Sequence, residues 1–198
     1  MSLLDITKYF VRRDLTGEDI QKVINRPPIL YSELSKYSSI SKLLPKATPY
    51  AIILYQNTKY DGHYVALFID DKGNLNFQDS YGYAPDQPIN MGMLAFDEQL
   101  PRYLTKLLDS SGMNLIINKI DYQSKKHPNY ADCGRHACLR ILLRNLNNQQ
   151  YSDLLIKNSR QNPFLTSDHI AVILTLPYLN DITKYYDDTG NITQAITK

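Results

Sequence analysis

The chain has 198 residues, of which 43% are hydrophobic, and this is enough to bury the core of one compact domain. Its formal net charge of +2 does not indicate a dedicated nucleic-acid-binding protein, which usually carries a strong basic stripe, and leaves open a weak contact with nucleic acid or an acidic partner. The polar first ten residues do not resemble a signal peptide, and the apolar stretch Ile170–Leu176 is too short to span a bilayer, so we expect a soluble intracellular protein that makes no membrane contact.

The N-terminal part of the chain, residues 1–48, has helical patterning. Thr16–Asp19 resembles a capping box in front of an apolar helical face. Pro27 and Pro28 would end this first helix. Ser32 is then placed to cap a second helix, which we expect to run to about Leu43.

The middle of the chain changes to strand patterning. Three runs are rich in β-branched and aromatic residues, namely Tyr50–Tyr55, His63–Ile69 and Leu75–Asp79. Asp70–Gly73 is a turn signal between the second and third of these runs. We therefore predict three adjacent antiparallel strands, with a fourth strand at Leu115–Ile120.

Helices are predicted again on either side of that fourth strand. Leu94–Leu108 has apolar residues at helical spacing, and Pro101 either divides this helix or lies in the first turn of a shorter one. After a polar loop, Gly134–Leu146 carries the strongest apolar helical face of the chain. Two shorter helices are expected around Tyr151–Lys157 and Ser167–Leu174. The order of elements predicts an α+β fold, with a mixed, mainly antiparallel central sheet flanked by helices.

Cys133 lies directly before the strongest predicted helix. A nucleophilic cysteine reacts as the thiolate, which a helix N-terminus and a neighbouring imidazolium both stabilise. Gly134 would allow a close backbone approach, and the free amides at the helix start could also bind an oxyanion. The sequence thus places a candidate nucleophile at the N-terminus of a buried helix.

His63 and Asp79 supply the remaining groups of a candidate catalytic triad. His63 begins one predicted strand and Asp79 ends the next. A hairpin with its turn near Gly73 would bring these two strand ends together, provided that the register does not slip by one residue. A carboxylate there would orient the imidazole toward Cys133.

The cysteines, histidines and arginines around Cys133 can also be interpreted as structural residues. Cys133 and Cys138 are five residues apart on one predicted helix, so we expect free thiols in a reducing compartment, with Cys138 in the core.

A zinc site is not predicted. One helix would carry Cys133, His136 and Cys138, and these side chains cannot converge on a tetrahedral ion, even with His127 added. His136 and His169 are expected at the surface or satisfied in the core. The arginines of the helix, Arg135, Arg140 and Arg144, are expected to be solvated.

The motifs resemble those of the adenain-like and ubiquitin-like-modifier proteases. Three motifs occur in the order and at the intervals of that family, over roughly residues 50 to 146. They are His63-Tyr64, Phe77–Ser80, and Gln123 followed by Asp132-Cys133-Gly134. The resemblance implies a cysteine protease fold with a His–Asp–Cys triad of His63, Asp79 and Cys133.

Two positions depart from the family pattern. The family has tryptophan after the histidine, where this chain has Tyr64, which would keep an aromatic wall along the substrate cleft. The family also places an oxyanion-hole glutamine shortly before the cysteine. Here Gln123 lies ten residues upstream, so either Gln123 or another residue such as Asn129 would take that role.

The resemblance implies a viral maturation protease, and a compact virophage enzyme fits best. Such enzymes cleave capsid or core precursors at Gly-containing small-residue sites, in the infected cell's cytoplasm or viral factory and in the virion. No cofactor would be needed for the chemistry, although some relatives require an activating peptide or DNA. An isopeptidase acting on ubiquitin or a ubiquitin-like modifier, an acyltransferase, and a catalytically silent virion-associated binding protein are the alternatives.

The resemblance also divides the chain. Residues 1–198 are interpreted as one cysteine protease domain. Its parts are an N-terminal helical segment, 1–48, a catalytic core, 50–146, and C-terminal helices with a polar tail, 147–198.

Overall fold

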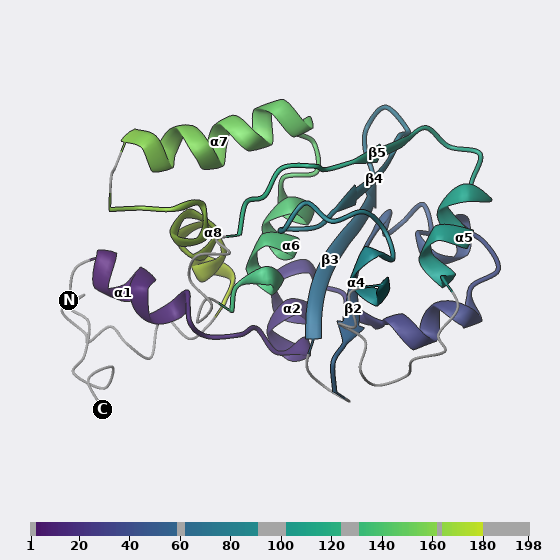
Figure 1. Ribbon diagram of the computed structural model, residues 1–198, viewed down its shortest axis with the longest axis horizontal. Coiled ribbons are helices and arrows are strands. Elements are labelled where there is room, and N and C mark those ends of the chain that lie inside the picture. The colour runs from purple at the N-terminus through teal and green to yellow at the C-terminus, as the bar shows by residue number, and fades with distance from the viewer. Residues whose placement is uncertain (1–2, 59–61, 91–101, 124–130, 162–163, 180–198) are drawn as a thin grey trace.

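The computed structural model describes residues 3–58, 62–90, 102–123, 131–161 and 164–179. These residues form an α+β fold around a five-stranded mixed sheet with helices on both faces (Figure 1). The strands lie in sequence order, and they are β1 (Ile29–Leu30), β2 (Tyr50–Gln56), β3 (Gly62–Ile69), β4 (Leu75–Gln78) and β5 (Leu115–Ile117). The pairs β2–β3 and β3–β4 are antiparallel, whereas the outer pairs β1–β2 and β4–β5 are parallel. The predicted α+β class, with a mixed sheet flanked by helices, and the three adjacent antiparallel strands are therefore confirmed.

The β3–β4 hairpin sets the register on which the site depends. Its turn is closed by the backbone N–H of Asp70, which donates to the carbonyl of Asn74, with Gly73 in the left-handed region at φ 79°. The Asp70 carboxylate also accepts the backbone N–H groups of Lys72 and Asn74. Ala66 consequently lies opposite Gln78, and the end of β4 lies near the start of β3.

Alternating side chains of the central strands build two apolar cores, one on each face of the sheet. In β2, Ile53 and Tyr55 pack with α5 (Tyr103–Asp109) and the 3₁₀ helix η1 (Tyr31–Lys36). On the other face, Tyr64, Ala66 and Phe68 of β3 pack with α2 (Gly17–Ile24) and α6 (Cys133–Leu142). Because both faces are covered, the central strands are almost continuously buried.

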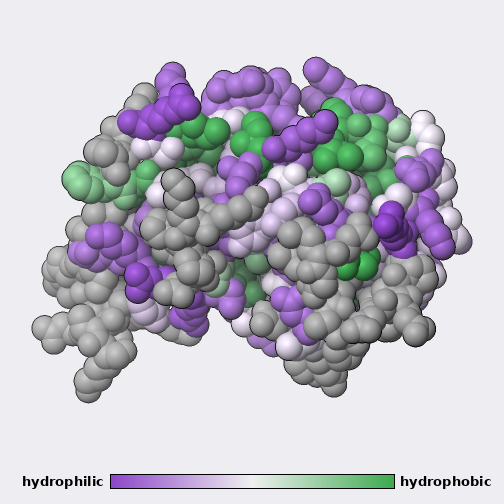
Figure 2. All heavy atoms as spheres, viewed as in Figure 1, coloured by the Kyte–Doolittle hydropathy of each residue, from purple (hydrophilic) through white to green (hydrophobic). Residues whose placement is uncertain are grey.

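Helix α6 is buried along most of its length, between the sheet on one side and α8 (Ser167–Thr175) on the other (Figure 1). The remaining helices are α1 (Leu3–Phe10), α3 (Ile40–Leu43), α4 (Gln87–Asn90), α7 (Asn148–Gln161) and the 3₁₀ helix η2 (Leu176–Tyr178). Figure 2 shows hydrophilic side chains gathered along the upper edge of this view, where α7 lies. Among the described residues, no helix has both the length and the apolar character needed to cross a membrane.

The capping box predicted in front of α2 is confirmed. The Thr16 hydroxyl accepts a hydrogen bond from the backbone N–H of Asp19, and the Asp19 carboxylate accepts the N–H of Thr16. The C-cap of the helix is Asn25, which adopts the left-handed conformation with φ 55°. The last helical residue, Ile24, therefore lies three residues before Pro27.

The second predicted helix is wrong in form. The segment instead divides into η1 and the short α3, and the Ser32 hydroxyl donates to the Gln56 side chain rather than capping a helix. Ser39 is extended between the two pieces, which breaks the helical path. The two-residue strand β1 was not predicted, because two apolar residues carry no period from which a strand can be recognised.

Other predicted boundaries also shift. The fourth strand ends at Ile117 rather than Ile120, and α6 ends at Leu142 rather than Leu146. Helix α5 begins only at Tyr103, while residues 94–101 of the predicted helix, Pro101 included, lie outside the described residues. Helix α7 is longer than predicted, because it extends beyond Tyr151–Lys157 at both ends.

The prediction of solvated arginines is wrong for Arg135 and Arg140, each of which is only 1% exposed. The Arg140 guanidinium lies 4.4 Å from the ring centre of Phe68 and donates to the carbonyls of Leu143 and Leu146. It thereby satisfies the carbonyl groups that follow the end of α6. A periodic pattern places arginine on the polar face of a helix, but it cannot show that another helix covers that face.

Candidate active site

His63 lies one residue inside the start of β3, next to Gly62. Its side chain is buried, and its ring stacks on the ring of Tyr81 with the centroids 5.2 Å apart. Gly62 is required by close packing, because a Cβ atom there would lie 1.8 Å from the backbone oxygen of Tyr55. Strand pairing and the absence of a side chain at Gly62 together fix the backbone position of His63, and therefore the position of its imidazole.

Asp79 follows directly after β4 and is completely buried. Its Oδ2 atom lies 2.9 Å from Nε2 of His63, while Oδ1 accepts the backbone N–H of Tyr81 at 2.7 Å. The two carboxylate oxygens thus have separate partners, one of which is the imidazole. Because Nε2 faces Asp79, Nδ1 is the imidazole nitrogen left for Cys133.

Asn118 holds the backbone of Asp79 in place, and sequence reasoning did not find this residue. The residue is 1% exposed, and its Nδ2 donates to the carbonyl of Asp79 at 2.9 Å and to the carbonyl of Ile120 at 2.8 Å. An asparagine after a short strand resembles many turn residues. Only the parallel pairing of β5 with β4 brings it beside Asp79.

Cys133 is the first residue of α6, is partly exposed and is a free thiol. The helix has ten residues, so its unpaired amides and dipole favour negative charge at this position. The thiol lies close enough to His63 to raise the pKa of its imidazole. Cys138, one turn further on, is also free but fully buried in the apolar core, as expected.

His63 has a strongly perturbed pKa. Burial alone would lower it, but the hydrogen bonds to Asp79 and Cys133, with the charges of both groups, overcome burial and raise the pKa of His63 from 6.5 to about 10. The imidazole is therefore charged at neutral pH when Cys133 is ionised. The arrangement can hold a thiolate–imidazolium pair.

The contribution of His63 to stability is expected to be greatest below about pH 6.5 and to fall as the pH rises toward 10. The reason is that the folded state, with the higher pKa, binds this proton more tightly than the unfolded state does between these limits. Urea unfolding of wild type and His63→Gln at pH 6, 8 and 10 measures the effect. The difference in unfolding free energy should shrink by a few kcal/mol, since one pKa unit is about 1.4 kcal/mol. A difference that grows with pH would contradict the assignment.

Gln123 is buried beside Asp79. The Ser80 hydroxyl donates to its Oε1 at 2.7 Å, and the backbone N–H of Gln123 donates to the carbonyl of Ser80 at 2.9 Å. These two bonds hold the Oε1 end of the amide at Ser80. The alternative oxyanion residue, Asn129, lies outside the described residues, as does His127.

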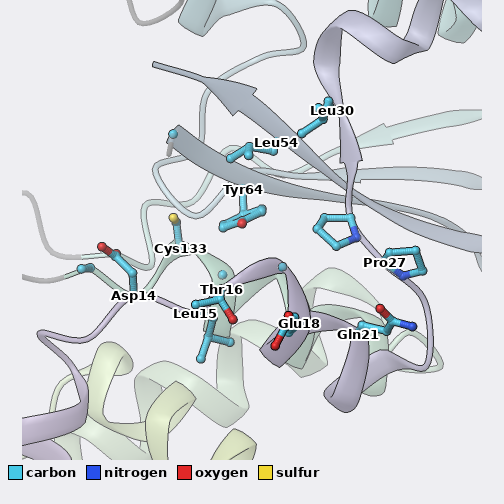
Figure 3. A pocket seen from close by; sticks show the side chains of 15 residues that line it. Asp14, Leu15, Thr16, Glu18, Gln21, Pro27, Leu30, Leu54, Tyr64 and Cys133 are labelled. Atoms are coloured by element: carbon cyan, nitrogen blue, oxygen red, sulfur yellow. The ribbon is translucent and has the colours of Figure 1, made fainter. Parts of the chain in front are cut away.

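Tyr64 and Cys133 line the same cavity of about 710 Å³ (Figure 3). Leu15 and Leu54 add apolar surface to it, and the exposed acidic residue Glu18 lies on its α2 side. A Cβ atom on the neighbouring Gly134 would lie 3.3 Å from Tyr64 Cδ2 and 3.2 Å from Leu15 Cβ. Glycine thus allows the start of α6 to pack directly against the cavity wall.

Comparison with known proteins gives one clear relative. The chain is 30% identical over 176 residues to the uncharacterized protein V9 of Sputnik virophage, an alignment that covers 85% of this chain and 98% of the virophage protein. The chain belongs to the same family as this virophage protein. The relationship supports a viral context for this chain, in line with the viral origin implied by its motifs.

Two further comparisons add less. No protein-family model matches the chain. Among solved structures, the central domain of the uncharacterized Lpg1148 protein from Legionella pneumophila is similar, with a TM-score of 0.42 and 14% sequence identity, over 84% of this chain and 98% of that domain.

Proposed function

We propose that this protein is a cysteine endopeptidase of the adenain-like type, with Cys133 as its nucleophile. The observation that carries the proposal is the position of His63, whose Nε2 lies 2.9 Å from Asp79, while Cys133 is close enough to raise the pKa of the same ring. Three residues far apart in the sequence meet where thiol chemistry requires them. The thiol also lies at a helix N-terminus and borders an open cavity.

In this mechanism the Cys133 thiolate attacks the carbonyl carbon of a peptide bond. Backbone amides at the start of α6 and the amide of Gln123 stabilise the negative charge that develops on the carbonyl oxygen. The imidazolium of His63 protonates the leaving amine, and water activated by the neutral ring then hydrolyses the acyl-enzyme. Asp79 keeps the ring oriented and favours its charged form.

The substrate is a polypeptide that lies along the cavity next to Tyr64. The volume of the cavity suits several side chains, and its mixture of apolar lining and acidic rim favours apolar and basic residues near the cut bond. The virophage relative supports a viral substrate, so capsid or core precursors cleaved at Gly-containing small-residue sites are the class proposed. Activation by a peptide or DNA is compatible with the nearly neutral charge of the chain.

Cleavage of the capsid precursor from the same genome is the direct test. Purified wild type should cleave it, and Cys133→Ala should lower the rate by at least about 10⁴-fold, because the covalent step is lost. Cys138→Ala is the matched control, since it removes a thiol that is buried in the core. Product bands are followed by electrophoresis and the new termini by mass spectrometry.

The same assay separates the alternatives. Cleavage of a ubiquitin-like conjugate in place of the precursor would assign an isopeptidase, and acetylation of an added protein would assign an acyltransferase. Equal cleavage by wild type and Cys133→Ala would overturn the proposed nucleophile. No turnover of any of these substrates, with or without a capsid peptide or DNA, would favour a silent binding protein.

A further inference from the structure

A second buried cluster of ionisable groups lies at the start of α6, apart from the triad. It consists of Asp132, which precedes the helix, His136, one turn along it, and Asp168 in α8. All three are at most 2% exposed, and one ligand atom from each lies within 4.8 Å of the others. His136 Nε2 is 3.1 Å from Oδ1 of Asp168 and 3.6 Å from Oδ2 of Asp132.

The Asp132 carboxylate is the member of this cluster whose burial is not compensated by hydrogen bonds. It is completely buried, it makes no capping hydrogen bond to α6, and neither of its oxygens accepts a hydrogen bond. Burying a carboxylate in this way costs several kcal/mol unless a cation or a set of donors compensates it. Burial raises the pKa of Asp132 for the same reason. One of its oxygens lies 3.6 Å from Nε2 of His136, so a compensating charge would belong in this cluster.

We propose that Asp132, His136 and Asp168 bind one divalent transition-metal ion, with zinc as the reference. Bonds of about 2.1 Å in tetrahedral geometry place ligand atoms about 3.4 Å apart, which the separations of 3.1 and 3.6 Å bracket. Two carboxylates and a neutral imidazole form a neutral complex with such an ion, and a water molecule completes four ligands. The metal would link the start of α6 to α8.

The competing explanation is an imidazolium between two carboxylates. A raised His136 pKa of about 10 suits that arrangement, and the 3.1 Å contact is also an ordinary hydrogen-bond length. It leaves the carboxylate of Asp132 with only the 3.6 Å ion pair to His136, whereas direct coordination would give that carboxylate a short bond. The two states differ in metal content, which can be measured directly.

The test uses the full chain carrying Cys133→Ala, so that the triad cannot bind zinc through its thiolate. The protein is stripped with a chelator, dialysed and titrated with zinc by calorimetry. We expect one ion per chain, and at a hundredfold excess over the dissociation constant a rise in melting temperature of about 5–10 °C. Asp168→Asn in the same background should lose both signals. Asp153→Asn, which changes an exposed aspartate of α7, should keep them.

Each outcome decides the proposal. Stoichiometric binding that Asp168→Asn abolishes and Asp153→Asn preserves supports the site. Absence of stoichiometric binding to the Cys133→Ala chain, whose fold is checked by circular dichroism, overturns it in favour of the imidazolium. Equal binding by both asparagine variants overturns it as well, because the ion would then be held elsewhere. None of these readouts depends on protease activity.

Discussion

Iodoacetamide at pH 6 is expected to alkylate Cys133 at least about a hundredfold faster than Cys138 in the native protein, because an ordinary thiol is almost entirely protonated at this pH. Cys133 is partly exposed, lies at a helix N-terminus, and is close enough to His63 to raise the pKa of the imidazole. Cys138 is fully buried, and burial raises the pKa of its thiol far above the ordinary value. Labelling rates at the two sites are read by mass spectrometry of peptides.

His63→Ala is the decisive variant in this experiment. It removes the cation that stabilises the thiolate but leaves Cys133 exposed, so the rate at Cys133 should fall toward that of an unactivated thiol. His169→Ala is a control, because it removes a buried histidine of α8 that bonds to Thr166 instead. If both cysteines react slowly and independently of His63, the triad is not assembled as a reactive site.

Gly62→Ala is expected to lower proteolytic activity at least about a hundredfold, since a displacement of roughly 1 Å in a catalytic group has this effect. The new Cβ atom would lie 1.8 Å from the Tyr55 carbonyl oxygen, which is backbone and cannot rotate away. The start of β3 must therefore move, and His63 is the next residue. The free energy of unfolding should also fall, by about 1–3 kcal/mol, as for other overpacked sites.

Gly17→Ala is the matched substitution for this prediction. Its Cβ atom would meet Pro28 at 3.5 Å, an ordinary contact, and alanine favours the helix that begins there. Activity and urea unfolding are measured for both variants. Equal activities of Gly62→Ala and Gly17→Ala would contradict the prediction, because β3 would then accommodate the new Cβ atom without displacing the imidazole of His63.

The sequence predicted the centre of the fold better than its edges. The strands at Tyr50, His63 and Leu75 and the helix at Gly134 have long apolar patterns, which local propensity and burial both favour. The segment from Ser32 to Leu43 failed because its helical pattern is interrupted by backbone geometry at Ser39, which composition does not reveal.

For the candidate site, the chain order of His63, Asp79 and Cys133 was sufficient to propose which residues meet. The turn at Asp70–Gly73 fixed the hairpin, and the hairpin brought the first two together. The roles of Asn118 and Gly62 were not predictable, because each depends on a backbone atom supplied by another strand.

The sequence by itself determined the α+β class, the central antiparallel strands and the order of the candidate triad residues, because these follow from local periods and from motif spacing. Tertiary structure alone decided that Arg135, Arg140 and His136 are buried and that Asp168 joins the cluster at the start of α6. The physical reason is that α8 covers the side of α6 that carries Arg135 and His136, while Phe68 of β3 and Tyr151 of α7 enclose Arg140. Which charges become buried depends on how distant helices pack, and no local pattern in the chain records this.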